Sequence, residues 1–266
     1  MENQNTQINE MCNPYRNDLG RVINYIKERN IPLRGNKIYS YDETFFEIIN
    51  TEEKAYWLGF LYADGMVRVR KTGSGIRLKL GVKDLSHIEK FKEVINSTHK
   101  ITFRPQKGVG GACYEFSIYS NKLAKDLINK GCKPNKSLIL TFPEFLSKEL
   151  LHHFIRGYFD GDGCVSYGFY KRKNRNKKSF VFMTRFISSS RRFLEDISKK
   201  LNIYATMRFG CISKHTGAYN LSYSKNDTIK LFNYMYKNSK NGLFLERKFA
   251  KFQEIFKILG INTLKN

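Results

Sequence analysis

The sequence predicts an α+β fold made by tandem, pseudo-twofold duplication of one αββαββα unit, preceded by a short helical extension at the N-terminus. Two observations predict this fold. The first is a pair of similar apolar helices that end on an acid and a glycine, "WLGFLYADG" at 57–65 and "IRGYFDGDG" at 155–163. The second is the same order of strand and helix patterns behind each helix, because an internal repeat indicates duplicated structural units.

In the first unit, the period of the apolar residues changes between two and about 3.6, as it does where strands and helices alternate. The last helix ends at Gly131, a residue type that favours the C-terminal cap. In order, the predicted elements behind the motif are strands at 66–70 and 75–84, a helix at 85–97, strands at 100–106 and 113–120, and a helix at 121–131.

The second unit repeats this order behind its own motif. Its segment "YNLSYSKN" at 219–226 matches "YEFSIYSN" at 114–121 in wording as well as in pattern. The predicted elements are strands at 164–173 and 179–188, a helix at 190–202, strands at 204–210 and 218–224, and a helix at 226–238. We therefore place the first lobe at 51–146 and the second lobe at 147–266.

Residues 1–50 lie outside the repeat and form the N-terminal extension. A helix is expected at 18–30, with Pro32 just beyond its end. Its basic face suits a DNA groove, as in a shortened helix-turn-helix, and suits equally a helix that merely packs on the first lobe.

The composition favours a nucleic-acid partner. Lys and Arg number 47 against 24 Asp and Glu, which gives a net charge of +23, and so large a basic excess points to a polyanion. The five cysteines contain no CxxC pair, which argues against a zinc site and a disulfide framework. Without an apolar run long enough to cross a bilayer, we expect an intracellular protein, in the cytoplasm of a bacterial or phage-infected cell or in an organelle matrix.

The acids that end the two helices need an explanation, because the C-terminal end of a helix repels negative charge. Gly59 and Gly157 stand four residues before Ala63 and Gly161, so each helix carries a stripe of small residues on one face. Such stripes allow two helices to pack closely, which would bring their acidic ends together. A shared divalent cation would remove the repulsion, and oxygen ligands suit Mg²⁺.

The two motifs with their spacing resemble those of the LAGLIDADG homing endonucleases, in the monomeric, two-motif form, over roughly residues 50–260. In that family the eighth motif residue is the metal-binding acid, which carries over to Asp64 and Asp162. The sixth position is Tyr62 in one copy and Asp160 in the other. The motif also departs from the consensus at Trp57 and Arg156, and we expect these changes to affect helix packing more than metal binding.

The resemblance implies a metal site made by Asp64 and Asp162 with the backbone of Ala63 and Gly161, holding two or three Mg²⁺ ions, with Mn²⁺ as a substitute. The family also carries a lysine near the start of the last helix of each half. The matching stretches here give Lys136 and Lys248 as catalytic candidates. A lysine is a suitable point charge for holding a nucleophilic water or a phosphate.

The resemblance also implies that two four-stranded sheets form a saddle on double-stranded DNA, with each lobe on one half-site. Basic residues on alternate strand positions could face a groove, and a basic hairpin tip could contact phosphate or simply be solvated. The candidates are Arg68, Arg70, Arg77 and Lys79 in the first lobe's first two strands, Lys171, Arg172, Lys173, Arg175, Lys177 and Lys178 at the hairpin, and Arg104, Arg185 and Arg208 on other strands.

The implied function is that of a homing endonuclease, which hydrolyses phosphodiesters across the minor groove of a long asymmetric target and leaves 3′ overhangs. Because both motifs lie in one chain, a monomer suffices. The alternatives are an RNA maturase acting on a host intron RNA, a non-cleaving DNA-binding regulator, an endonuclease embedded in an intein and a helix-turn-helix transcription factor. The retained acids favour the nuclease over the first two, and no splicing blocks are evident. A helix-turn-helix transcription factor would leave the duplication unexplained.

Overall fold

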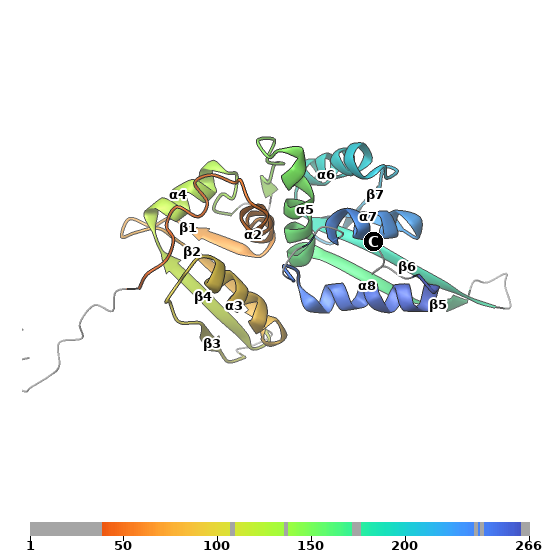
Figure 1. Ribbon diagram of the computed structural model, residues 1–266, viewed down its shortest axis with the longest axis horizontal. Coiled ribbons are helices and arrows are strands. Elements are labelled where there is room, and N and C mark those ends of the chain that lie inside the picture. The colour runs from red at the N-terminus through yellow and green to blue at the C-terminus, as the bar shows by residue number, and fades with distance from the viewer. Residues whose placement is uncertain are drawn as a thin grey trace, which may run out of the picture. The chain divides into compact units, whose positions relative to one another are not determined.

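The computed structural model describes residues 39–106, 110–135, 138–171, 177–236, 239 and 242–261, and the structural statements below concern these residues (Figure 1). The helix expected at 18–30 lies outside them. The compact unit that contains both lobes begins at Ser40. Phe45 and Phe46 are buried in its core, where the Phe46 ring packs beside Phe91 of the first lobe and the Phe45 ring packs on Phe46.

The first lobe follows the predicted order of elements. The motif helix is capped by the Thr51 side chain, which accepts a hydrogen bond from the Lys54 backbone amide, as an N-cap residue does. The elements are α2 (Glu52–Ala63), β1 (Gly65–Arg68), β2 (Gly75–Gly81), a 3₁₀ turn (Val82–Asp84), α3 (Leu85–Val94), β3 (Thr102–Arg104), β4 (Cys113–Tyr119) and α4 (Asn121–Asn129).

The second lobe repeats this order and then adds a helix. Its elements are α5 (Lys148–Asp162), β5 (Gly163–Lys171), β6 (Lys178–Ser188), α6 (Arg191–Ala205), β7 (Cys211–His215), β8 (Ala218–Ser224), α7 (Asn226–Tyr236) and α8 (Glu246–Leu259). The added helix α8 lies along the second sheet in Figure 1 and buries Phe252, Ile255 and Phe256.

The sheet topology confirms the duplication. The first lobe has a four-stranded sheet in the order β1-β2-β4-β3, and the second has one in the equivalent order β5-β6-β8-β7, with every pairing antiparallel. The two segments with matching wording, β4 and β8, hold the same place in their sheets. The predicted α+β fold, built from two copies of one unit, is therefore the fold of the protein.

One predicted strand is wrong. Residues 204–210 were expected to form a strand, but α6 continues to Ala205 and the strand β7 begins only at Cys211. The helix ends because Thr206 adopts the left-handed conformation, with φ of 51°, as a C-cap. Arg208 therefore lies in a loop, where its guanidinium donates to Asp227 Oδ2 at 2.8 and 3.0 Å.

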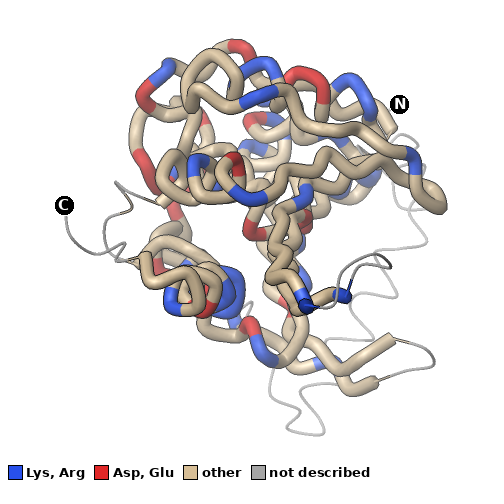
Figure 2. Tube along the Cα trace, turned by 90° about the vertical axis from the view of Figure 1, so that its right-hand side faces the viewer, with Lys and Arg blue, Asp and Glu red and all other residues tan. Residues whose placement is uncertain are grey.

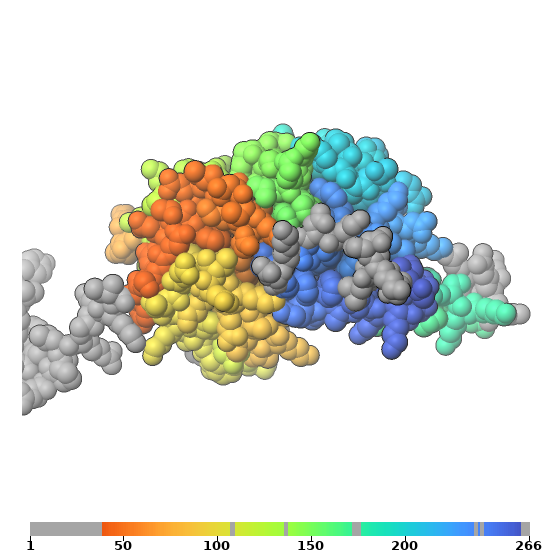
Figure 3. All heavy atoms as spheres, in the orientation of Figure 1, coloured from red at the N-terminus to blue at the C-terminus, as the bar shows by residue number. Residues whose placement is uncertain are grey.

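A buried arginine ties the two lobes together. Arg156 of α5 is fully buried, and its guanidinium donates to the carbonyls of Met235 (2.7 Å) and Leu243 (3.0 Å) and to Glu52 Oε1 (2.8 Å) at the start of α2. Buried charge is stable only when it is paired and hydrogen-bonded. The unusual arginine of the second motif thus serves helix packing, and the side chains of the two lobes meet over much of their boundary in Figure 3.

A buried histidine makes the fold sensitive to acid. Burial, followed by Lys90, Arg247 and Lys248, lowers the pKa of His87 to about 3. Between pH 6.5 and 3 the unfolded chain therefore binds a proton that the native protein does not, so stability falls as the pH falls. We expect this residue to contribute a loss of about 5 kcal/mol at most. Urea unfolding at a series of pH values should show a shallower decline for His87→Gln than for the unchanged protein. Equal slopes would contradict this assignment.

Candidate functional site

The two motif helices approach each other closely at their glycines. A Cβ atom added at Gly157 would lie 2.0 Å from the Tyr56 carbonyl oxygen, and one added at Gly59 would lie 2.1 Å from that of Phe154. Farther along, a Cβ at Gly161 would lie 2.3 Å from Ala63 Cβ. No side chain fits at these contacts, so the close packing expected from the small-residue stripes is confirmed.

This packing brings the two acidic helix ends together. The helix α2 ends at Ala63 with Asp64 as its C-cap, and the Asp64 amide donates to the Phe60 carbonyl at 2.9 Å. The helix α5 continues through Asp162 to its C-cap at Gly163. Asp64 Oδ2 lies 3.4 Å from the Cβ position at Gly161, which immediately precedes Asp162 in the chain. The carboxylate of one lobe thus stands at the helix end of the other.

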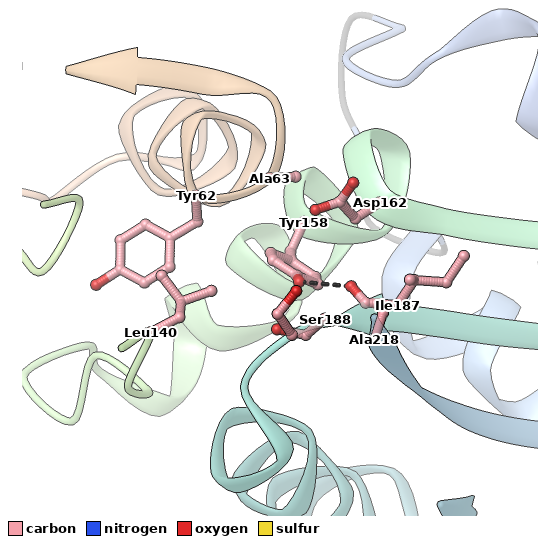
Figure 4. Close-up of a pocket in the computed structure, with 9 residues that line it drawn as sticks. Tyr62, Ala63, Leu140, Tyr158, Asp162, Ile187, Ser188 and Ala218 are labelled. Atoms are coloured by element: carbon pink, nitrogen blue, oxygen red, sulfur yellow. Dashed lines mark hydrogen bonds between the residues drawn. The ribbon is translucent and has the colours of Figure 1, made fainter. Parts of the chain in front are cut away.

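A pocket of about 170 Å³ opens beside this convergence on the side of the second lobe. Asp162, Ala63 and Tyr158 line it (Figure 4). The Tyr158 hydroxyl donates to the Ile187 carbonyl at 2.7 Å, as the dashed line in Figure 4 shows. Burial, then Asp162 and to a smaller extent Asp64, raises the pKa of Tyr158 far above its usual value. Tyr158 is therefore a neutral wall of the pocket rather than an acid or a base.

The ammonium group of Lys248 lies at the C-terminal end of α5, beside these acids. Lys248 lies in the first turn of α8, is only 4% exposed, and its ammonium donates to the carbonyls of Gly161 (2.7 Å) and Phe159 (2.8 Å). These carbonyls belong to the negative end of α5, where a cation is favourable. Burial lowers the pKa of Lys248 to about 8, although the carboxylates of Asp160, Asp64 and Asp162 act to raise it.

The residue that fixes the start of α8, and hence Lys248, was not assigned a role from the sequence. Asp160 is fully buried and accepts hydrogen bonds from the hydroxyls of Tyr56 (2.8 Å) and Tyr236 (3.0 Å) and from the Leu245 amide (2.9 Å). Leu245 is the N-cap residue of α8. The sequence feature that could have indicated this role is the difference at the sixth motif position, where one copy has Asp160 and the other has Tyr62.

In the first lobe, different side chains contact the end of the motif helix. The Tyr62 hydroxyl donates to the Lys130 carbonyl at 2.5 Å, next to Gly131, whose φ of +96° suits a residue without a Cβ. The Cys132 thiol donates to the Leu61 carbonyl at 3.4 Å. Leu61 is the first-motif equivalent of Phe159, so a thiol stands where the second lobe has an ammonium. Lys136 lies outside the described residues, and so does its relation to Asp64.

The donor set at the helix ends fits a hard divalent cation. The expected ligands are the carboxylates of Asp64 and Asp162 and the backbone carbonyls of Ala63 and Gly161, of which the Gly161 carbonyl also accepts from Lys248; oxygen-only sites of this kind bind Mg²⁺ or Ca²⁺. Gly161 matters here because a Cβ would fill the space beside Asp64 Oδ2. Within the described ranges, three or more His, Cys, Asp or Glu side chains are nowhere grouped as metal ligands, so the pair would need backbone, water or phosphate oxygens to complete a shell.

The first-lobe basic candidates lie on one face of the sheet. Arg68, Arg77, Lys79 and Arg104 stand opposite the buried face, and in the two strands β1 and β2 they alternate with Val67, Ile76, Leu78 and Leu80. Arg70 follows the end of β1 and is exposed.

The second-lobe candidates are more dispersed. Arg185 lies on the outer face of β6, and Arg208 is held by Asp227 in its loop. Lys171 ends β5 and pairs with Lys178 at the start of β6, in a hairpin that projects past the rest of the lobe in Figure 1. Lys177 adjoins it, whereas Arg172, Lys173 and Arg175 lie outside the described residues. Figure 2 shows basic residues distributed over the chain with acidic ones between them.

Comparison with known proteins supports the interpretation of the motifs. Residues 149–235 match the LAGLIDADG-like domain. The Replication factor C small subunit of Methanocaldococcus jannaschii is 29% identical over 224 residues, which are 80% of this chain but 11% of that protein. The chain thus spans about a tenth of the length of this curated relative. None of the described helices is both long and apolar enough to span a membrane.

Solved structures share the fold over most of the chain. One is the I-LtrWI LAGLIDADG homing endonuclease bound to target DNA, with a TM-score of 0.53 and 14% identity, over 79% of this chain and 92% of that one. Another is the I-SmaMI LAGLIDADG homing endonuclease bound to cleaved DNA, with a TM-score of 0.51 and 15% identity, over 80% and 90%. The protein therefore contains a LAGLIDADG-like domain and has the two-lobed LAGLIDADG endonuclease fold.

Proposed function

We propose that this protein is a homing endonuclease, a monomer that makes a site-specific double-strand cut in DNA with bound Mg²⁺. The observation that carries the proposal is the meeting of Asp64 and Asp162 at the ends of two helices that pack through glycines. Two carboxylates at negative helix ends repel each other. A strongly basic chain that concentrates acid at one place is suited to bring metal and phosphate together there.

In this proposal Asp64 and Asp162 hold the metal with the carbonyls of Ala63 and Gly161. Bound Mg²⁺ would supply Lewis-acid stabilisation of the phosphate oxygens and lower the pKa of a coordinated water. The chain's own groups do the remaining work. The basic outer faces of the sheets place the DNA backbone over the helix ends, and Lys248 holds positive charge beside the scissile phosphate. Each lobe would read one half-site about one helical turn from the other, with the acids over the minor groove between them.

The test is cleavage of DNA from the insertion-free form of the locus that carries this gene, at fixed salt, with Mg²⁺ and then with Ca²⁺. A single Mg²⁺-dependent staggered cut with 3′ overhangs supports the proposal. Tight binding with no cut under any divalent cation would overturn it and favour the non-cleaving alternatives, an RNA maturase or a DNA-binding regulator. Splicing of the host intron RNA would then be assayed.

Lys248 provides a second test of the same site. Replacing it with Met removes the ammonium but keeps an unbranched apolar stem, and we expect cleavage to slow about a hundredfold, as when one preorganised donor is lost. DNA affinity should change little, because Lys248 is buried rather than on the outer face. Single-turnover rates with saturating enzyme separate the two effects, and an unchanged rate would remove Lys248 from the site.

A further inference from the structure

The outer faces of the two sheets differ sharply in charge. Among its described residues, the face of the first sheet opposite its core carries five charged side chains, Arg68, Arg77, Lys79, Arg104 and Glu115, beside Met66, Ser117 and Tyr119. The equivalent face of the second sheet is made by Cys164, Ser166, Tyr170, Val181, Met183, Arg185, Asn220, Ser222 and their neighbours. Among the described outer-face residues of β5, β6 and β8, Arg185 is the one with an ionised side chain.

On the first face, the charges are organised around Glu115. Its carboxylate accepts from Arg104 at 3.0 Å and lies 3.6 Å from Arg77, while Lys79 is its partner across the β2–β4 pairing. These ion pairs hold the guanidinium groups on the sheet surface, and a surface pair of this kind is weak enough to exchange for another partner. The arrangement presents forked donors and one acceptor.

On the second face, two apolar side chains, Val181 and Met183, lie in the central part beside tyrosine and polar side chains. Val181, Met183 and Tyr170 line a hollow of about 320 Å³ together with Arg185 and Ser166. The Arg185 guanidinium lies against the Met183 thioether, 2.9 Å from its sulfur, as the Arg77 guanidinium lies 3.0 Å from the Met66 sulfur on the first face. Side chains around this hollow offer methyl and methylene surface with small hydroxyl groups at its margin.

These chemistries suit different bases. In the major groove, Arg and Lys donate to guanine O6 and N7, and Glu accepts from cytosine N4, whereas apolar side chains contact the thymine methyl group. We propose, on the premise of the proposed function, that the lobes read half-sites of different composition. Arg77 and Lys79 of the first lobe read G·C pairs, and Val181 and Met183 of the second lobe read thymine methyl groups.

The experiment begins with selection of bound duplexes from a library randomised over about two helical turns (~21 bp). One half of the selected site should be rich in G·C pairs and the other in A·T pairs. The variant Arg77→Ala identifies the first-lobe half, because base preference there should relax by about tenfold or more at one position. Lys199→Ala, which removes an exposed charge from the surface of α6, is the matched control and should leave both halves unchanged.

Modified bases then test each contact on the selected duplex. Deoxyuridine in place of thymidine removes only the methyl group, and should weaken binding severalfold in the second-lobe half and not in the other. The variant Met183→Ala should lose most of that sensitivity. Replacement of guanine by 7-deazaguanine removes the N7 acceptor and should have its effect in the first-lobe half, with the effect lost in Arg77→Ala.

Two half-sites of equal composition, or equal sensitivity to deoxyuridine in both halves, would overturn the inference. Failure to select any preferred sequence would overturn it as well. A selected duplex that shows the expected asymmetry but is never cut would instead overturn the nuclease proposal and leave the base reading intact. The two failures are therefore distinguishable in one series of duplexes.

Discussion

Replacing Asp162 with Asn is expected to abolish DNA cleavage while DNA binding survives. The change removes one negative charge from the C-terminal end of α5 and keeps the size of the side chain. If the carboxylate helps to hold a cation that stabilises several kcal/mol of transition-state charge, its loss should slow cleavage by about a thousandfold or more. Binding should stay the same or tighten slightly, because the removed charge repels phosphate.

The equivalent change at Asp64 should have the same effect, because Asp64 Oδ2 lies 3.4 Å from the Cβ position at Gly161, next to Asp162 in the chain, and the proposed site uses both acids. Glu195→Gln is a suitable control, since Glu195 lies on the surface of α6 and pairs with Arg191. Cleavage and gel-shift affinity would be measured on the same duplex for all three variants. Normal cleavage by either Asp variant would contradict the assignment of that residue, and loss of binding together with cleavage would indicate a structural rather than a chemical role.

Replacing Gly157 with Ala is expected to be among the most destabilising small changes in the protein. The new Cβ would lie 2.0 Å from the Tyr56 carbonyl oxygen and 2.9 Å from the Phe60 nitrogen, both backbone atoms that cannot turn away. The helices would have to separate, and overpacking of this kind costs about 3 kcal/mol or more. Chemical unfolding monitored by circular dichroism measures the loss.

Gly81→Ala is the matched control for this experiment. No atom lies within 4 Å of a Cβ built at Gly81, and its φ of −59° is one that alanine adopts freely. Stability should stay the same or rise by a few tenths of a kcal/mol, because alanine restricts the unfolded chain. If Gly157→Ala were as stable as Gly81→Ala, the close approach of α2 and α5 would be wrong.

The closeness of the helices could be predicted from the sequence because it depends on a local pattern. Glycines at equivalent motif positions, with another small residue four places later, mark one face of each helix. The strands β2 and β8 could also be predicted, because apolar and polar residues alternate along them. The strand expected at 204–210 failed because a helix can end on a left-handed threonine, and a pattern of apolar residues does not reveal such an end.

What could not be predicted were contacts between residues far apart in the chain. The bond from the Leu245 amide to Asp160 joins a motif residue to a helix that begins long after it. Arg156 is a departure from the motif in the sequence. Only the structure shows that its guanidinium donates hydrogen bonds to Glu52 and to two backbone carbonyls. The place of Lys248 at the end of α5 depends on both contacts. Sequence position alone made it a candidate among many surface lysines.

Calorimetric titration of Ca²⁺ into the protein bound to its DNA, for the unchanged chain and for Asp64→Asn and Asp162→Asn, would show whether these two acids hold a metal together. Ca²⁺ accepts the same oxygen ligands as Mg²⁺ in a more flexible geometry, and the signal does not depend on cleavage. If the two helix ends hold one shared site, each variant alone should lose most of the binding. If both variants bound Ca²⁺ as tightly as the unchanged protein, Asp64 and Asp162 would not be its ligands.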